Sequence, residues 1–289
     1  MRYRFLYLFV VLLGLGITAC ESDFIEGAKN NDTKEVSESE SVISLVTQRA
    51  DEVINLTIDA PALDRFGVWI DLNGDGFRAE DGSEDVTVFN AYQEYVLSAG
   101  VKSVSVYGDI TYLGAASNEL TGIDITGNPY LTTLNVPMNR LGSIDLSANT
   151  ALERLDVSGN NIASLHVSSN TLLESLWVFN NELSSLDVSS NPGLLFLDCS
   201  GNALRSLDVS ANVQLVRLLA YNNQLTGLDI SNNTALNRLW LFGNPLSNTE
   251  TGNLVSALGN ASHGDLWLSM EPLSEDVRSS AAEKGWAVQ

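Results

Sequence analysis

The chain has 289 residues, 44% of them hydrophobic, which is enough for one long domain or two compact ones. It contains 15 Lys and Arg against 36 Asp and Glu, so its formal net charge is −21 at pH 7. A polyanion of this kind repels a phosphate backbone, and no basic patch with interleaved aromatic residues is present. We therefore expect no nucleic-acid partner.

The first twenty residues have the pattern of a targeting segment. Arg2 and Arg4 precede an apolar run, residues 5–17, which is too short for a comfortable membrane span. The end of this run, Ile17-Thr18-Ala19-Cys20, resembles the bacterial lipobox. That resemblance implies a lipoprotein signal peptide at residues 1–19 and diacylation of the Cys20 thiol. The alternative is an ordinary signal peptide in which Cys20 is incidental.

A lipobox implies a location as well as a modification. It implies a chain that is secreted across the inner membrane and lipid-anchored at the cell envelope, at the outer membrane or the cell surface, with more than one acyl chain for stable anchoring. Residues 20–41 are acidic and rich in Ser and Asn, so we expect a flexible tether. Cys199, the only other cysteine, occupies a repeat position that elsewhere holds Val or Leu, which predicts a small buried hydrophobe.

Residues 42–108 predict a small β-rich N-terminal capping region. Short runs with strand character occur at residues 53–58, 66–71, 86–89 and 92–97, separated by Gly, Asn and Asp clusters.

A repeat follows, with the pattern L-x-x-L-x-L-x-x-N. Its asparagines stand at positions 118, 128, 139, 149, 160, 170, 181, 191, 202, 212, 223, 233 and 244. The intervals alternate between 10 and 11, so the period is 21 residues with a half-period inside it. This pattern resembles bacterial leucine-rich repeats of the internalin-like kind, found in surface lipoproteins.

The predicted fold is mainly β, a leucine-rich-repeat solenoid over residues 109–245 with parallel sheets on both faces. Alternating apolar residues point to one side of a strand, and two such strands per coil enclose a leucine core. The recurring asparagine lies where the chain turns, where its amide can pair with buried backbone groups. A solenoid needs caps at its ends. Residues 246–289 predict an α/β C-terminal cap, with a helix in 246–258, a strand at 265–268 and a helix that starts at Ser274 and stops at Lys284-Gly285.

The two half-repeats carry different outward residues. One half is monotonous, with an Asp in most coils and His166 in place of one of them, and we interpret it as a solvated face, with a ladder of cations as the alternative. Its aspartates are Asp124, Asp145, Asp187, Asp208 and Asp229. The other half varies and carries large aromatic residues in its last four coils, which are typical of binding hot spots. The candidate ligand-binding residues are Arg154, Trp177, Phe179, Phe196, Arg217, Leu219, Tyr221, Arg238, Trp240 and Phe242.

These residues favour binding, and two kinds of partner stay open. The aromatic strip from 177 to 242 predicts adhesion to another protein, which the resemblance also implies, or stacking on the sugar rings of a glycan. A third possibility is that the rings stack on one another as packing alone. We expect a monomer, since nothing in the sequence demands a partner copy.

A separate loop has a calcium-binding pattern. Asp71, Asn73, Asp75, Phe77 and Asp81 follow the first half of a D-x-N-x-D-G loop, in which alternate oxygen ligands converge on Ca²⁺. The twelfth position is Gly82 instead of the usual Glu, so a simple Asn-Gly and Asp-Gly turn without an ion is the alternative.

No catalytic motif is present. The chain has two histidines, His166 and His263, and no serine elbow, HExxH pattern, phosphate-binding loop or dinucleotide fingerprint. The sequence predicts a binding protein with no catalytic residues.

Overall fold

The structure is a computed structural model that describes residues 41–269 and 271–289. The predicted signal peptide, Cys20 and the tether up to residue 40 lie outside these residues. Within the described part of the chain, no helix has both the length and the apolar character needed to cross a membrane.

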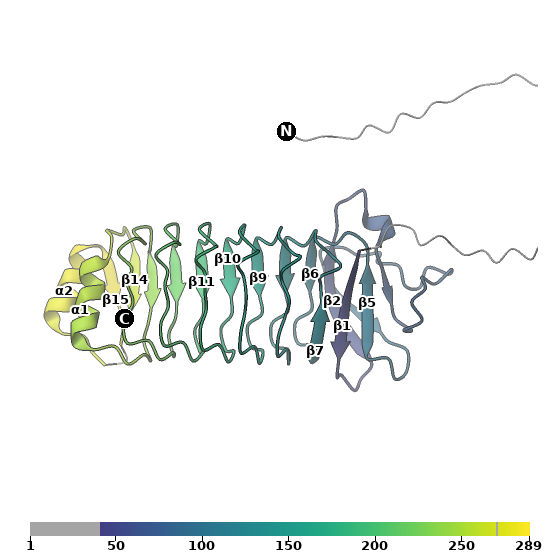
Figure 1. Cartoon of the computed structure of the whole chain (residues 1–289), viewed down its shortest axis with the longest axis horizontal. Helices are drawn as coiled ribbons and strands as arrows, with labels where there is room; N and C mark the ends of the chain where they lie inside the picture. The colour runs from purple at the N-terminus through teal and green to yellow at the C-terminus, as the bar shows by residue number, and fades with distance from the viewer. Residues whose placement is uncertain (1–40, 270) are drawn as a thin grey trace, which may run out of the picture. The chain divides into compact units, whose positions relative to one another are not determined.

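One long sheet runs through the repeats, as Figure 1 shows. From β6 to β15 its strands are parallel, and each pairs with the strand of the next coil. These strands are β6 (Tyr112–Gly114), β8 (Thr133–Asn135), β9 (Arg154–Asp156), β10 (Ser175–Trp177), β11 (Phe196–Asp198), β12 (Arg217–Leu219), β13 (Arg238–Trp240), β14 (Gly264–Trp267) and β15 (Trp286–Val288).

Each solenoid strand is short because only its central residue has to enter the core. Leu134, Leu155 and Leu176 are Cα partners in adjacent strands, and each is fully buried. A column of identical leucines then stacks along the sheet, which buries apolar surface that no single coil could cover. The predicted solenoid with a leucine core is confirmed.

The predicted second parallel sheet is wrong. The monotonous half-repeat is extended but forms no strand in the coils from residue 140 onward. Its aspartates accept hydrogen bonds from the backbone two residues further on. The N–H of Ser147 donates to Oδ1 of Asp145 at 2.9 Å, and Asp187, Asp208 and Asp229 make the same turn. This turn does not by itself exclude a sheet, because Asp156 and Asp198 accept from the N–H groups of Ser158 and Ser200 in the same way after strands that do pair. The second sheet is absent because no backbone hydrogen bond joins residues 143–148 to the adjacent coils.

Two ladders of buried asparagine hold the coils together. In the ladder after the monotonous half, Nδ2 of Asn170 donates to the carbonyls of Leu146 (3.0 Å) and Asn149 (2.8 Å) of the preceding coil. In the ladder after the sheet strand, Asn160 accepts from the N–H of Leu141 and donates to the carbonyl of Val136. The predicted role of the recurring asparagine is confirmed.

The N-terminal cap adds antiparallel strands to the first coil. A four-stranded sheet has the order β3-β5-β1-β7, and β2 and β4 extend the solenoid sheet beyond β6. The elements are β1 (Val42–Thr47), β2 (Val53–Asp59), the 3-10 helix η1 (Arg65–Gly67), β3 (Trp69–Asp71), β4 (Tyr92–Val96), β5 (Ser103–Tyr107) and β7 (Leu120–Asp124).

The strand expected at residues 86–89 does not form. Only a single bridge, between Trp69 and Asp85, precedes it. The N–H of Val86 donates to Val68, but Val88 is exposed and has no neighbouring strand to pair with. Extended backbone without a partner does not become a strand.

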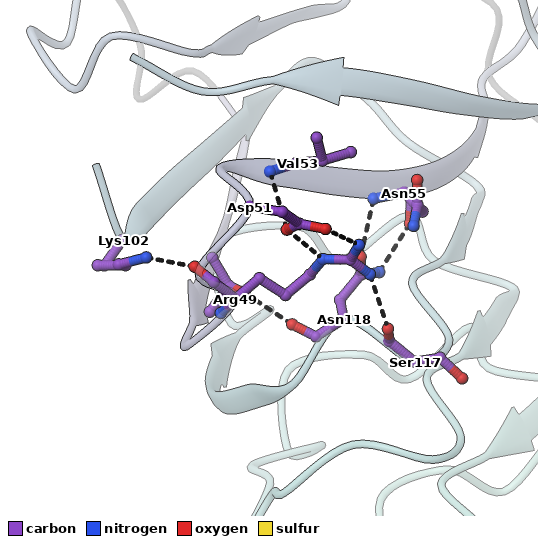
Figure 2. Close-up of polar contacts among 8 residues, drawn as sticks. Arg49, Asp51, Val53, Asn55, Lys102, Ser117 and Asn118 are labelled. Atoms are coloured by element: carbon purple, nitrogen blue, oxygen red, sulfur yellow. Dashed lines mark hydrogen bonds and ion pairs between the residues drawn. The ribbon is translucent and has the colours of Figure 1, made fainter. Parts of the chain in front are cut away.

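The cap is joined to the first coil through the loop between β1 and β2 (Figure 2). The guanidinium of Arg49 pairs with Asp51 and donates to the carbonyl of Ser117. Asn118, the first ladder asparagine, exchanges hydrogen bonds with the backbone of Asn55 at 2.7 and 2.8 Å. The ladder therefore begins inside the cap, which leaves no unpaired first coil.

The C-terminal cap agrees with its prediction. Helix α1 (Asn248–Ala257) starts at Ser247, whose side chain accepts from the N–H of Glu250, and α2 (Glu275–Glu283) follows Ser274. Leu254, Leu258 and Trp286 are buried against the last coil.

Removing one ladder asparagine should cost far more than removing an exposed one. Asn170→Ala removes two buried hydrogen bonds, to the carbonyls of Leu146 and Asn149, which then keep only their backbone donors. At about 0.5–1.5 kcal/mol for each lost bond, we expect urea denaturation to show a loss of about 1–3 kcal/mol. Asn161→Ala, an exposed asparagine in an adjacent coil, is the matched control and should change stability by less than about 0.5 kcal/mol. Equal losses in the two variants would contradict the ladder's role.

Candidate functional site

The varied side chains lie on the outward side of β6 and β8 to β14, which we call the sheet face. The opposite, monotonous side carries Asp145, Asp187, Asp208 and Asp229, and we call it the Asp face. Register along the sheet aligns Trp177 with Asp156 on one side and Asp198 on the other, so outward residues form continuous columns.

Four rings pack together at the C-terminal end of the sheet face. Tyr221 stacks on Phe242 with ring centroids 4.6 Å apart and planes 8° from parallel. Phe242 lies 4.0 Å from Trp267, and Trp240 meets Trp267 edge-on at 6.0 Å. We call these residues, Tyr221, Trp240, Phe242 and Trp267, the aromatic cluster. The cluster brings three of the sequence-predicted residues together.

Trp267 belongs to this site and was missing from the sequence-based selection. It is the Cα partner of Trp240 and so continues the same column. The interval between them is 27 residues because α1 is inserted after Asn244, which breaks the period of 21. The signal was the strand pattern Asp265-Leu266-Trp267-Leu268, which repeats that of Arg238-Leu239-Trp240-Leu241.

Trp240 is the most constrained ring of the cluster. The guanidinium of Arg238 lies over it, 5.0 Å from the ring centroid, and pairs with Asp265 at 2.9 Å. Its indole Nε1 is buried and has no acceptor among the described residues.

The middle of the sheet face holds a smaller pair. Trp177 and Phe196 lie 5.0 Å apart in a tilted arrangement, and both are half-buried. Leu219 points outward but is covered by its neighbours, with 9% of its surface exposed. Two predicted cations stay at the surface: Arg217 is exposed, and Arg154 makes only loose ion pairs, at 3.7 and 3.9 Å, with Glu174 and Glu153. Phe179 is half-buried beside this pair.

Between Trp177 and Leu219 lies a buried carboxylate, Asp198. Ser200 donates to its Oδ1 from both Oγ and the backbone N–H. Burial nevertheless raises the pKa of Asp198, because loss of hydration outweighs these two bonds. Cys199 is fully buried, as its repeat position predicted, and burial raises the pKa of its thiol.

The Asp face has the opposite electrostatics. Hydrogen bonds from Ser147, Ser189, Ser210 and Ser231 lower the pKa values of Asp145, Asp187, Asp208 and Asp229, which remain at the surface. His166 replaces one of these aspartates and is exposed. The uniform residues of this face therefore serve the turn, which is a structural reason for their repetition.

In the loop that follows β3, carboxylates bind backbone. Asp71 accepts from the N–H groups of Gly74 and Gly76, and Asn73 and Asp75 accept from groups two residues further on. Glu84, which sequence reasoning missed, is buried and accepts from Leu72 and Ala79 across the loop.

The remaining residues of the predicted calcium set face solvent. Asp81 and Phe77 are exposed. Within residues 41–269 and 271–289, no three His, Cys, Asp or Glu side chains come close enough to share a metal ion. A cation in this loop would need amide and backbone oxygens in addition to carboxylates.

Solved structures with a similar backbone are leucine-rich-repeat proteins. An internalin, InlF, from Listeria monocytogenes matches with a TM-score of 0.50 and 24% identity, over 57% of this chain and 50% of that one. A functional domain of InlJ from the same species, which includes a cysteine ladder, matches at 0.47 and 26% identity, over 62% and 49%. A leucine-rich-repeat protein of Leptospira interrogans matches at 0.45 and 28% identity, over 46% and 37%.

The likeness to InlF shows an internalin-like leucine-rich-repeat fold, as the asparagine spacing predicted. The chain spans half the length or less of these three solved chains. A model of the LVIVD repeat family matches residues 100–134, from just before β5 into β8. No curated protein matches the sequence.

The raised pKa of Asp198 predicts a pH-dependent gain from Asp198→Asn. Ionised Asp198 destabilises the fold above its folded-state pKa, and this penalty disappears as the pH falls through that pKa. We expect the variant to melt at a higher temperature than the wild type at pH 7, with the difference shrinking toward pH 3. Asp187→Asn is the matched control: its folded pKa is lowered, so it should lower the melting temperature at pH 7. An unchanged or lower melting temperature for Asp198→Asn would refute the penalty.

The calcium hypothesis stays a prediction with a direct test. If the loop of Asp71, Asn73, Asp75, Phe77 and Asp81 binds Ca²⁺, millimolar Ca²⁺ should raise the melting temperature relative to chelator, by mass action on the folded state. Asp75→Asn should abolish that rise. Identical melting in Ca²⁺ and in chelator would leave the loop as a turn that needs no ion.

Proposed function

We propose that the chain is a non-catalytic envelope protein that binds another protein through the sheet face, with the aromatic cluster at the centre of the contact. The observation that supports this best is the cluster itself: four large rings, Tyr221, Trp240, Phe242 and Trp267, on the outward side of a sheet whose core is already filled by leucine.

The arrangement of the rings favours a protein partner over a sugar. Tyr221, Phe242 and Trp267 lie against one another, so their faces are covered from within the cluster. A stacked sugar needs a free ring face, whereas a protein surface can pack on the edges and flanks of a rigid aromatic block. Arg238 beside the cluster is also of a residue type that recurs at hot spots.

The N-terminal sequence supports a location for the protein. We propose that Cys20 carries the lipid and holds the chain at the outer membrane or the cell surface, because Ile17-Thr18-Ala19-Cys20 has the lipobox pattern. Metabolic labelling with palmitate that persists in Cys20→Ser would contradict this anchor.

The proposed function is tested by a matched pair of double variants. Cross-linking of the full-length chain in its own cells, followed by affinity capture, identifies a partner whose Kd is then measured with wild type and with Tyr221→Ala/Trp240→Ala. Because a hot-spot ring contributes about 2 kcal/mol or more, we expect at least about a thirtyfold weaker Kd if one of the two rings is a hot spot and about a thousandfold weaker Kd if both are.

The control carries the same number of substitutions on the Asp face. Asp208→Ala/Asp229→Ala should leave the Kd unchanged, and both variants must keep the wild-type circular dichroism spectrum. A Kd that is unchanged by the loss of Tyr221 and Trp240 but rises in the control would move the contact to the Asp face and refute the proposal.

A further inference from the structure

A hollow of about 330 Å³ opens on the sheet face, in coils that precede the aromatic cluster. Its volume lies at the lower end of the range for small-molecule sites, about 300–1,000 Å³. It spans β6, β8, β9 and β10, and its lining consists of Tyr112, Thr133, Leu134, Asn135, Arg154, Asp156 and Trp177.

The polar side chains of the hollow are balanced in charge and mixed in hydrogen-bonding type. Arg154 offers donors, because its two ion pairs are loose and its side chain is 52% exposed. Asp156 offers acceptor capacity, since Ser158 occupies only its Oδ1. One positive and one negative group side by side disfavour a ligand with a net charge of either sign.

Asn135 adds an acceptor that the chain leaves unused. It is the Cα partner of Asp156, and its Oδ1 is buried with no donor among the described residues. Several other asparagines, among them five of the ladder, also have an unpaired Oδ1, but among the described residues only Asn135 of this set lines the hollow, where a ligand hydroxyl can donate to it. A hydroxyl group supplies such a donor and can also accept from Arg154.

Trp177 provides an apolar wall. Phe196, from the following coil, lies against one side of its ring, and the hollow lies toward the preceding coils, on the other side. That side of the ring is therefore uncovered, unlike the rings of the aromatic cluster. The carbon-bound hydrogens of a pyranose form an apolar face that packs on such a ring, while its hydroxyls face the polar groups of the hollow.

We propose that this hollow binds one hexose unit of a neutral glycan, with Trp177 as the stacking ring and Asn135, Arg154 and Asp156 as hydrogen-bonding partners. This is a second ligand site on the sheet face. It goes beyond the protein contact proposed at the aromatic cluster and does not depend on it.

The test is isothermal titration of the full-length chain with maltohexaose, cellohexaose, mannohexaose and chitohexaose. We expect saturable binding of at least one of them, with a Kd that changes less than about twofold between about 0.1 and 0.5 M salt, because no net charge is involved. Trp177→Ala and Asp156→Ala should weaken it at least about tenfold. Asp208→Ala on the Asp face is the control and should leave the Kd unchanged.

Thr133→Val is a second test variant, chosen because it should fold even if the alanine variants do not. It removes one hydroxyl from the hollow and places a strand-favouring residue in β8, so it should fold and bind several-fold more weakly. Its protein partner should still be captured, which separates this site from the aromatic cluster.

Two results would overturn the proposal. One is the absence of binding by all four neutral oligosaccharides. The other is binding of polygalacturonate or of a lysine-rich peptide that depends on Asp156 or Arg154 and disappears at high salt, which would assign the hollow to a charged ligand.

Discussion

The rest of the solenoid depends on the hydrogen bonds that buried asparagine side chains make between adjacent coils. Every coil leaves carbonyls that face its neighbour inside the stack, and amide groups such as that of Asn170 pair with them from 21 and 24 residues further along the chain. These fixed offsets forbid insertions between ladder positions. The longer connection that holds α1 appears only after Asn244, the last ladder residue, where no further amide has to find its partner.

The same constraint explains why one face varies and the other does not. On the Asp face, Asp145 and its counterparts hold their own backbone turns, so a change there costs structure. On the sheet face the backbone is paired by the sheet. Asp156 and Asp198 hold a turn there too, but the other outward side chains of the strands are not needed for it. The outward residues of the sheet face can therefore change from coil to coil without loss of the fold, which makes this face suited to binding a ligand.

The sequence predicts those structural features whose residues recur at a constant spacing along the chain. The leucine core, the asparagine ladders and the helix that starts after Ser274 follow from local patterns alone. The second sheet was predicted wrongly because x-L-x-L alternation is the same whether or not the backbones of neighbouring coils form hydrogen bonds with each other. Trp267 was missed because α1 shifts it out of period, and Glu84 because its partners, Leu72 and Ala79, are five to twelve residues away in a loop without a repeat.

The hollow and the aromatic cluster differ in how their rings pack against neighbouring side chains. The repeat period does not predict this packing. Strands about 4.8 Å apart bring successive outward rings into contact wherever adjacent coils both carry one, as in Tyr221 and Phe242. Where the preceding coils carry Asp156 and Asn135 instead, Trp177 keeps one side uncovered. Small polar residues beside a large ring create a recess, and consecutive large rings fill one. The order of residues along two adjacent columns, that of Trp177 and Trp240 and that of Tyr221 and Phe242, therefore produces a hollow in the early coils and a solid aromatic surface in the last ones.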